Sequence, residues 1–306
     1  MTTFLGELSK KLAERWLTLL VLPGLLWCGA VIAAAVLGQR SALDLHAADA
    51  WINSLANRTS GQRPTVAAIT VATLLGAAAV VGLIADWLGT LVDRVWTAHG
   101  TSWATRWLAQ RRTNRWDKAF DEFERSIAGS ATDPGSSAVA RARARCMAIS
   151  PVRAARPMWI GDRLQAADKR VHEKYGIDLS PTWPRLWTVL PDSARSDLAT
   201  ALDSYAAAAR LVGWGLLYLV VTPWWWPAAP IGGAVVFRGW RCGRSAAQVL
   251  AELTETTVDL YGPTLARQFG IDCNGLLTTD IGNRVSEIAR KDSTFYSHRQ
   301  PRPPET

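Results

Sequence analysis

Long, largely apolar segments alternate with charged segments along this chain. The apolar segments lie at about residues 16–38, 66–87 and 204–244. A helix needs about 20 apolar residues to cross about 30 Å of hydrocarbon. The third segment is long enough for two helices. The pattern therefore predicts an all-α, helical integral membrane protein with two transmembrane hairpins, about four spans in total.

The same pattern divides the chain into six segments. Residues 1–15 carry apolar and charged side chains at helical spacing, which is typical of a helix on a membrane surface and also of a lead-in to the first span. The others are a first hairpin at 16–96 with an external loop at 39–64, a cytoplasmic helical region at 97–203, a tryptophan-turn membrane hairpin at 204–244, cytoplasmic helices at 245–290 and a disordered tail at 291–306.

The tryptophan-turn hairpin is the most distinctive segment. Trp224, Trp225 and Trp226 stand between two prolines, and the run Leu211–Phe237 carries no charge. Tryptophan is enriched at membrane interfaces and proline breaks helices, so we predict a bend at this point. Legs of about 20 residues would cross the bilayer, whereas legs of about 12 residues would form a re-entrant wedge about 18 Å deep. A single span ranks last, because it would bury all three tryptophans at mid-depth.

Small residues recur along the second apolar segment at helical spacing, at Ala78, Gly82, Ala85 and Gly89. Such a stripe allows close packing of membrane helices. Asp86 lies on an overlapping face and suggests a proton or cation relay. The other interpretation, which its position favours, is that Asp86 lies at the cytoplasmic boundary and pairs with Arg94 or a neighbouring arginine. The other polar candidates in the membrane segments are Asp93, Arg210 and Arg238.

Tryptophan and arginine alternate directly after the second apolar segment. The aromatic and apolar residues follow helical spacing approximately and are interleaved with arginines, among them Arg111, Arg112 and Arg115; the spaced residues are Trp103, Trp107, Trp116, Phe120, Phe123 and Ile127. These residue types suit an interfacial helix on anionic lipid headgroups, and the aromatic stripe equally suits the core of a small helical domain. Nucleic-acid stacking uses the same residue types, but the neighbouring membrane segment makes that partner unexpected.

Further along, polar residues that could carry function gather around a predicted helix end. We expect a helix to end at Tyr175 with Gly176 at its cap. Asp162, Arg163, Asp178 and Arg185 flank this point and suit either an ion-pair clasp between short helices or a docking site. The segment Phe269–Asp272 echoes Tyr175–Asp178, which weakly suggests a duplicated arrangement.

Charge and motifs limit the chemistry. The net charge is +8, and the excess of basic residues in 97–203 predicts that this region and both termini are cytoplasmic. The four cysteines are widely spaced, which makes a disulfide framework or zinc site improbable. The sequence has no phosphate-binding loop, dinucleotide fingerprint, metalloprotease motif or nucleophile elbow. We therefore expect no enzyme activity, no catalytic residues, no metal and no cofactor.

Several motifs resemble uncharacterised multi-pass membrane proteins of Streptomyces-type actinobacteria. They are Leu22–Gly24, Gly161–Arg163, Tyr175–Leu179, Trp183–Trp187, Leu190–Asp192 and the tryptophan-rich hairpin. The resemblance covers most of the chain and implies a bacterial plasma-membrane protein. It implies no activity and no site residues.

Together these features predict a bacterial membrane scaffold or adaptor. Its cytoplasmic helices would dock a protein partner or a second copy of the chain, and anionic lipid headgroups would be a further partner. The alternative is a small oligomeric transporter or channel that uses Asp86 and the hairpin arginines.

Overall fold

A computed structural model describes residues 21–39, 41, 42, 44, 46, 49–51, 53, 54, 64–98, 103–129, 137–273 and 275–291. Within these residues the protein is all-α, with 85% of them helical and no strands. This confirms the predicted fold class at the level of secondary structure. The amphipathic segment 1–15, the start of the first span, much of loop 39–64 and the tail from residue 292 lie outside the described residues.

The helices belong to two compact units. Unit 1 is formed by the described parts of residues 1–94 and by residues 206–242, and unit 2 by the described parts of 95–205 and 243–306. Two long helices contribute residues to both: α9 (Asp192–Val221) and α10 (Ala228–Gln268). The units therefore do not follow the linear order of segments that the sequence suggests.

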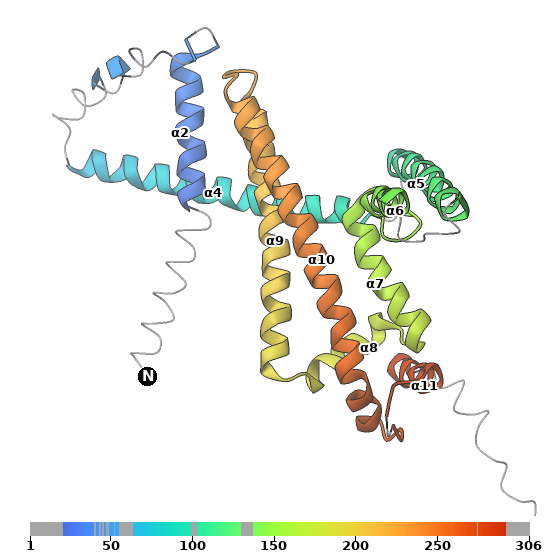
Figure 1. Ribbon diagram of the computed structural model, residues 1–306. Coiled ribbons are helices and arrows are strands. Elements are labelled where there is room, and N and C mark those ends of the chain that lie inside the picture. Colours follow the sequence, from blue (N-terminus) through green and yellow to red (C-terminus); the bar gives the residue numbers. More distant parts are fainter. Residues whose placement is uncertain are drawn as a thin grey trace, which may run out of the picture. The chain divides into compact units, whose positions relative to one another are not determined.

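Unit 1 contains α2 (Leu22–Leu37), most of α4 (Pro64–Thr97) and the hairpin made by the end of α9 and the start of α10. The chain turns at residues 222–227, where the sequence predicts a bend. Helix α4 runs across α2 and does not lie along it (Figure 1). The contact with α2 gathers around Ala78, which packs on Val21 and Cys28.

Two described helices, α4 and α9, are long and apolar enough to cross a membrane. Helix α2 is apolar but has only 16 described residues. The structure therefore gives no support for four spans.

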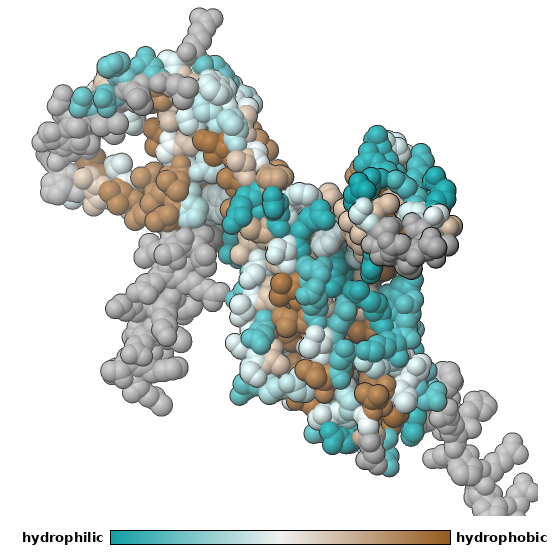
Figure 2. Space-filling view, in the orientation of Figure 1, coloured by the Kyte–Doolittle hydropathy of each residue, from teal (hydrophilic) through white to brown (hydrophobic). Residues whose placement is uncertain are grey.

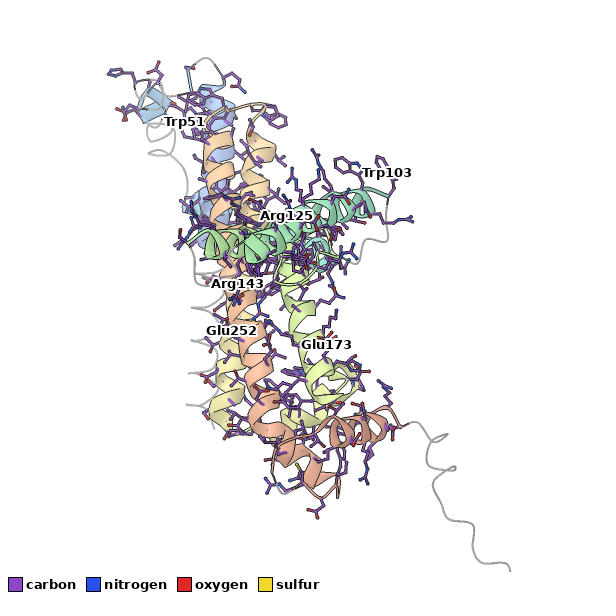
Figure 3. All side chains as sticks on the ribbon, turned by 45° about the vertical axis from the view of Figure 1, so that its right-hand side comes forward. Trp51, Trp103, Arg125, Arg143, Glu173 and Glu252 are labelled. Carbon is purple, nitrogen blue, oxygen red and sulfur yellow. The ribbon has the colours of Figure 1, made fainter. Side chains whose placement is uncertain are left out.

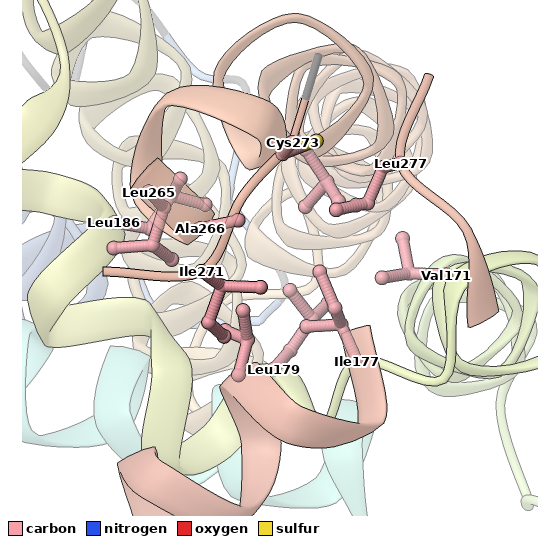
Figure 4. Close-up of a cluster of buried hydrophobic side chains, with 11 residues drawn as sticks. Val171, Ile177, Leu179, Leu186, Leu265, Ala266, Ile271, Cys273 and Leu277 are labelled. Atoms are coloured by element: carbon pink, nitrogen blue, oxygen red, sulfur yellow. The ribbon is translucent and has the colours of Figure 1, made fainter. Parts of the chain in front are cut away.

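Unit 2 is a polar, all-helical unit with its own core. It contains α5 (Trp103–Gly129), α6 (Ser137–Ile149), α7 (Trp159–Tyr175), α8 (Leu179–Val189) and α11 (Thr279–Arg290), with the remaining parts of α9 and α10. Val171, Ile177, Leu186, Leu265 and Val285 are nearly inaccessible and pack together in this core (Figure 4).

Two glycines end helices beside this core. Helix α7 ends at Tyr175 as predicted, and Gly176 adopts a left-handed conformation with φ 68°. Gly270 does the same after α10 with φ 72°, and the N–H of Ile271 closes the helix end on the carbonyl of Ala266. Ile177 and Ile271 then enter the same apolar cluster. The sequence echo thus marks two similar helix ends that meet in one core.

Trp96 fixes the end of α4 within unit 2. Its side chain is only 4% exposed and meets Tyr205 edge-on, with ring centroids 5.7 Å apart. Gly161 and Gly243 provide the necessary space, because a Cβ on either would clash with Trp96. Trp96 therefore joins the last turn of α4 to α9 through Tyr205, and to α7 and α10 at these two glycines.

Candidate functional site

The tryptophan turn is held by the segment that follows α2. The side-chain nitrogen of Gln39 donates to the carbonyls of Thr222 and Pro223, at 2.9 and 2.7 Å. Its oxygen accepts the backbone N–H of Trp226 at 3.2 Å, and the indole of Trp225 donates to the carbonyl of Ala42 at 3.0 Å. Backbone groups that the turn leaves without helical partners are thereby satisfied.

The three tryptophans consequently differ. Trp225 is half-buried and packs with Ala34, Val221 and Ala228, whereas Trp224 and Trp226 are 62% and 47% exposed. Only the outer two remain available to a membrane interface. No sequence motif pointed to Gln39. The feature that could have identified it is its position, because Gln39 is the first polar side chain able to donate hydrogen bonds after the apolar run of α2.

Trp27 on α2 organises the middle of unit 1. Its indole donates to the carbonyl of Leu217 at 3.1 Å, and its ring contacts the cluster of Val81, Ala85 and Trp214. Trp27 also lines a cavity of about 320 Å³, together with apolar residues of α2, the end of α9 and Trp224 of the turn. The pocket offers no charged group and so has no residue suited to acid–base chemistry.

Helix α4 meets α9 through its small-residue stripe. Ala78, Gly82, Ala85 and Gly89 are all buried, although most of α4 around them is exposed. A Cβ on Gly213 of α9 would lie 2.6 Å from the carbonyl oxygen of Ala85. Gly and Ala therefore permit a backbone approach that larger residues would prevent.

An ion pair lies at this crossing. Nε of Arg210 donates to Oδ1 of Asp86 at 2.6 Å, and the two side chains are 29% and 50% exposed within the described structure. Arg210 comes within reach because Gly89, one turn beyond Asp86, lies against the Arg210 backbone. The sequence pattern favoured Arg94 or a neighbouring arginine as the partner of Asp86, whereas the structure gives Arg210 on another helix. Arg238 is exposed on α10, and Asp93 is half-buried near the end of α4.

The aromatic–basic stretch on α5 has two different faces. Trp103 and Trp107 are 81% and 52% exposed, and Arg111 lies over the Trp107 ring at 5.1 Å. Arg115 is also exposed. The side chain of Trp103 projects outward in Figure 3. The second half of the stretch is different, because Trp116 stacks on Phe120 at 4.8 Å and both are half-buried.

Arg112 belongs to the inner face and not to the exposed one. It forms an ion pair with Asp162 at 2.9 Å, with 18% and 1% of the side chains exposed. It also donates to the carbonyls of Ile149 and Arg156, each at 2.6 Å. The expected role of Arg112 at the membrane interface does not fit this position, since its guanidinium is turned toward the protein. Asp162 in turn accepts backbone N–H bonds from Ala155 and Arg156.

The four candidate clasp residues do not pair with one another. Each instead bonds a residue elsewhere in unit 2. Arg163, 4% exposed, donates to Glu255 at 3.0 Å and to Gln248 at 2.8 Å. Asp178 accepts from Arg290 on α11 at 2.8 Å. Arg185 donates to the carbonyl of Pro181 within α8.

These contacts tie α5 to α7, α7 to α10, and the start of α8 to α11. They satisfy buried charges with opposite charges and carbonyls, which is the requirement for placing ionised groups in a protein interior. The set therefore holds helices together and presents few of these groups to a ligand.

In the described part of the chain, the possible metal ligands do not form a cluster and most of the cysteines are buried. No group of three or more His, Cys, Asp or Glu side chains within it is arranged to hold a metal ion. The cysteines are free, with Cys146 and Cys273 buried. Burial raises the pKa of the Cys146 thiol, which lowers its fraction of reactive thiolate at neutral pH.

No protein-family model matches the chain, and no significant match was found among the curated proteins or the solved structures.

Proposed function

We propose that the protein is a bacterial plasma-membrane scaffold or adaptor. Unit 1 anchors it in the bilayer, and unit 2 is a folded cytoplasmic part that binds a protein partner or a second copy of the chain. The observation that carries the proposal is the contrast between the surfaces of the two units. Apolar side chains gather on the first part of α4, while hydrophilic side chains cover much of unit 2 (Figure 2).

Helix α4 supports the anchoring role. Its most apolar stretch has a mean hydropathy of 2.3 but is only 17% buried. The core helix of a soluble protein would instead be mostly covered. Ile69, Val71 and Leu83 are 66%, 56% and 54% exposed. Such a continuous apolar surface is unfavourable in water and favourable in hydrocarbon. Lipid is therefore the environment that this helix fits.

The depth of the hairpin fits a re-entrant wedge better than a full crossing. Helix α9 continues from Arg210 to Val221, which at 1.5 Å per residue is about 17 Å. The hydrocarbon layer is about 30 Å thick. If the Asp86–Arg210 pair lies just inside the hydrocarbon at its cytoplasmic edge, the tryptophan turn lies within the bilayer and both termini remain cytoplasmic. A cysteine at Trp225 should then resist an impermeant maleimide added outside the cell.

Unit 2 supports the scaffold role because its charged residues are used internally. The pairs Arg112–Asp162 and Arg163–Glu255 join separate helices of unit 2. A rigid helical unit with an independent core is suited to presenting a binding surface. The transporter alternative has less support, because Asp86, its best relay candidate, is already paired with Arg210.

The anchoring and docking roles can be tested together in native membranes. A photo-crosslinking amino acid would replace Leu260 in unit 2 or Ile69 in α4, which are 63% and 66% exposed. We expect Leu260 to give a discrete protein adduct and Ile69 to give lipid adducts. Absence of any protein adduct and of self-association would contradict the scaffold role. Release of the chain by alkaline carbonate would contradict the anchoring role.

The transporter alternative has its own measurement. Purified protein in liposomes should give no ion flux above empty vesicles. A flux that Asp86→Asn abolishes would replace the scaffold proposal with the relay.

A further inference from the structure

One exposed face of α5 combines aromatic and basic side chains. Trp103, Trp107, Arg111, Arg115 and Lys118 succeed one another at intervals of four, four, four and three residues. All five are exposed. At 3.6 residues per turn they occupy one side of the helix. We call these five residues the basic–aromatic face.

Folding of unit 2 does not require this face. The opposite side of α5 makes the internal contacts, through Ala109, Arg112 and Trp116. Trp116 donates to the carbonyl of Ser150 at 3.2 Å, whereas Trp103 and Trp107 extend away from the same helix. Exposed tryptophans at the start of one helix are a costly surface in water, so they point to an interaction.

The charge of the face selects an anionic partner. Between Trp103 and Lys118 the sequence contains one acid, Asp117, together with Arg106 and the four other basic residues. Asp117 is occupied by a bidentate contact with Arg153, at 2.9 and 3.0 Å. Arg111 lies over the Trp107 ring, which leaves a cation and an indole side by side. This combination matches the headgroup region, where indoles are favoured and basic side chains meet anionic lipid.

Chain length keeps the face near the anchor. Helix α4 ends at Thr97 and α5 begins at Trp103. Six residues extend at most about 20 Å, at 3.3–3.6 Å per residue. Trp103 therefore cannot lie farther than this from the end of the helix that we assign to the membrane.

We propose that the basic–aromatic face lies on the anionic cytoplasmic surface of the bilayer, with Trp103 and Trp107 among the headgroups and Arg111, Arg115 and Lys118 facing phosphates. This inference rests on the proposed function, because it needs unit 1 in the membrane. It adds a second lipid contact that orients unit 2 against the surface.

The test uses the full chain in lipid nanodiscs, with Cys242 replaced by Ser and a fluorophore on a cysteine at Trp103. Nanodiscs contain either phosphatidylcholine alone or phosphatidylcholine with 30% phosphatidylglycerol, and the lipids carry a nitroxide quencher at the headgroup. We expect strong quenching in the anionic nanodiscs and much less in the neutral ones. A label at Glu173, which is exposed on α7, should remain unquenched in both.

Charge reversal provides a matched comparison. Arg111→Glu with Arg115→Glu should reduce the apparent binding of the face at least about tenfold, since each basic residue contributes appreciably near an anionic surface. Arg141→Glu with Arg143→Glu makes the same change in charge at exposed positions of α6 and should have little effect. High salt should weaken the quenching, because it shortens the screening length to about 3 Å at 1 M.

The outcomes separate this inference from the proposed function. Protein that inserts into nanodiscs but leaves the Trp103 label unquenched overturns the lipid contact and leaves the anchor in place. Equal quenching in neutral and anionic nanodiscs, or equal losses in the two charge-reversal variants, overturns the selection of anionic lipid. A label that responds only to added single-stranded oligonucleotide identifies nucleic acid as the partner and overturns the proposal. Protein that does not insert overturns both.

Discussion

The two units hold their helices together by different means. In unit 1, helices meet where glycine and alanine allow backbones to approach, and single side chains such as Trp27 and Arg210 add hydrogen bonds across the contacts. In unit 2, a conventional apolar core is surrounded by ion pairs that join separate helices. In lipid there is no hydrophobic drive to bring helices together, so close packing must do so. In water burial of apolar surface supplies the drive, and polar pairs then fix which helices meet. The difference fits the environments that we propose.

Each unit has a buried cysteine that reports its unfolding. Cys146 lies in unit 2 and Cys28 in unit 1 against Ala78. The rate of thiol labelling at increasing denaturant therefore measures the stability of each unit separately in the intact chain.

The largest effect is expected from Asp162→Ala in unit 2. The change leaves Arg112 with 18% side-chain exposure and no carboxylate, and it removes the acceptor of two backbone N–H groups. Loss of one partner of a buried pair costs about 3–5 kcal/mol. Labelling of Cys146 should become correspondingly faster. The control is Asp117→Ala, which breaks an exposed pair with Arg153 and should cost far less. Equal losses in the two variants would contradict a structural role for Arg112–Asp162.

Asp86→Asn should have the next largest effect and reports the surroundings of its pair. An unpaired Arg210 in the bilayer costs about 2–3 kcal/mol, whereas loss of a pair in water costs about 1 kcal/mol or less. We expect the larger value, measured by labelling of Cys28 in nanodiscs. The double variant Asp86→Asn with Arg210→Gln should recover part of the loss. A loss of the smaller size would place the pair in water.

Gly213→Ala tests the close crossing of α4 and α9. The new Cβ would lie 2.6 Å from the Ala85 carbonyl oxygen, so the helices must separate. Overpacking of this kind costs about 1–3 kcal/mol. Gly233→Ala is the control, because its Cβ would enter open space in the same hairpin. Labelling of Cys28 should accelerate only in the first variant. If Gly213→Ala left the labelling rate unchanged, close backbone packing would not be what holds the helices of unit 1 together.

The smallest effect concerns pH and the exposed Asp117. Its hydrogen bond with Arg153 lowers the pKa of the carboxyl below the ordinary value of an aspartate, 3.8. The folded state therefore favours the carboxylate, and the stabilisation is present above pH 3.8 and is lost as pH falls through the folded pKa. Wild type should be slightly more stable than Asp117→Asn at pH 7, and the difference should shrink as the pH falls below 3.8. A difference that grows on acidification would contradict this sign.

The sequence identified local features well. Gly176 lies where a left-handed cap was expected after Tyr175, and the bend falls at the predicted prolines. The small-residue stripe on α4 was also visible as a spacing, and its members are buried. These features depend on neighbours within about one or two helical turns, so a linear pattern can encode them.

The candidate site was recovered only in part. The aromatic–basic stretch had two open interpretations, as a lipid-facing helix and as a core. In the structure Trp107 is exposed, whereas Trp116 faces the interior of unit 2, although both belong to the same helically spaced aromatic series. Arg112 sits beside Arg111 in sequence but turns inward. Periodicity groups residues by face, yet it does not say which face another helix will cover.

Unaided, the sequence determined an all-α chain with apolar helices, a tryptophan bend, small-residue packing surfaces and glycine helix ends. The tertiary structure decided the partners. Asp86 meets Arg210 across 124 positions, and Arg163 meets Glu255 across 92. It also decided that α4 crosses α2 and that the polar candidates tie separate helices together. The reason is that helix propensity and amphipathicity are set within a few residues, whereas pairing depends on how whole helices cross, and many crossings satisfy the same pattern.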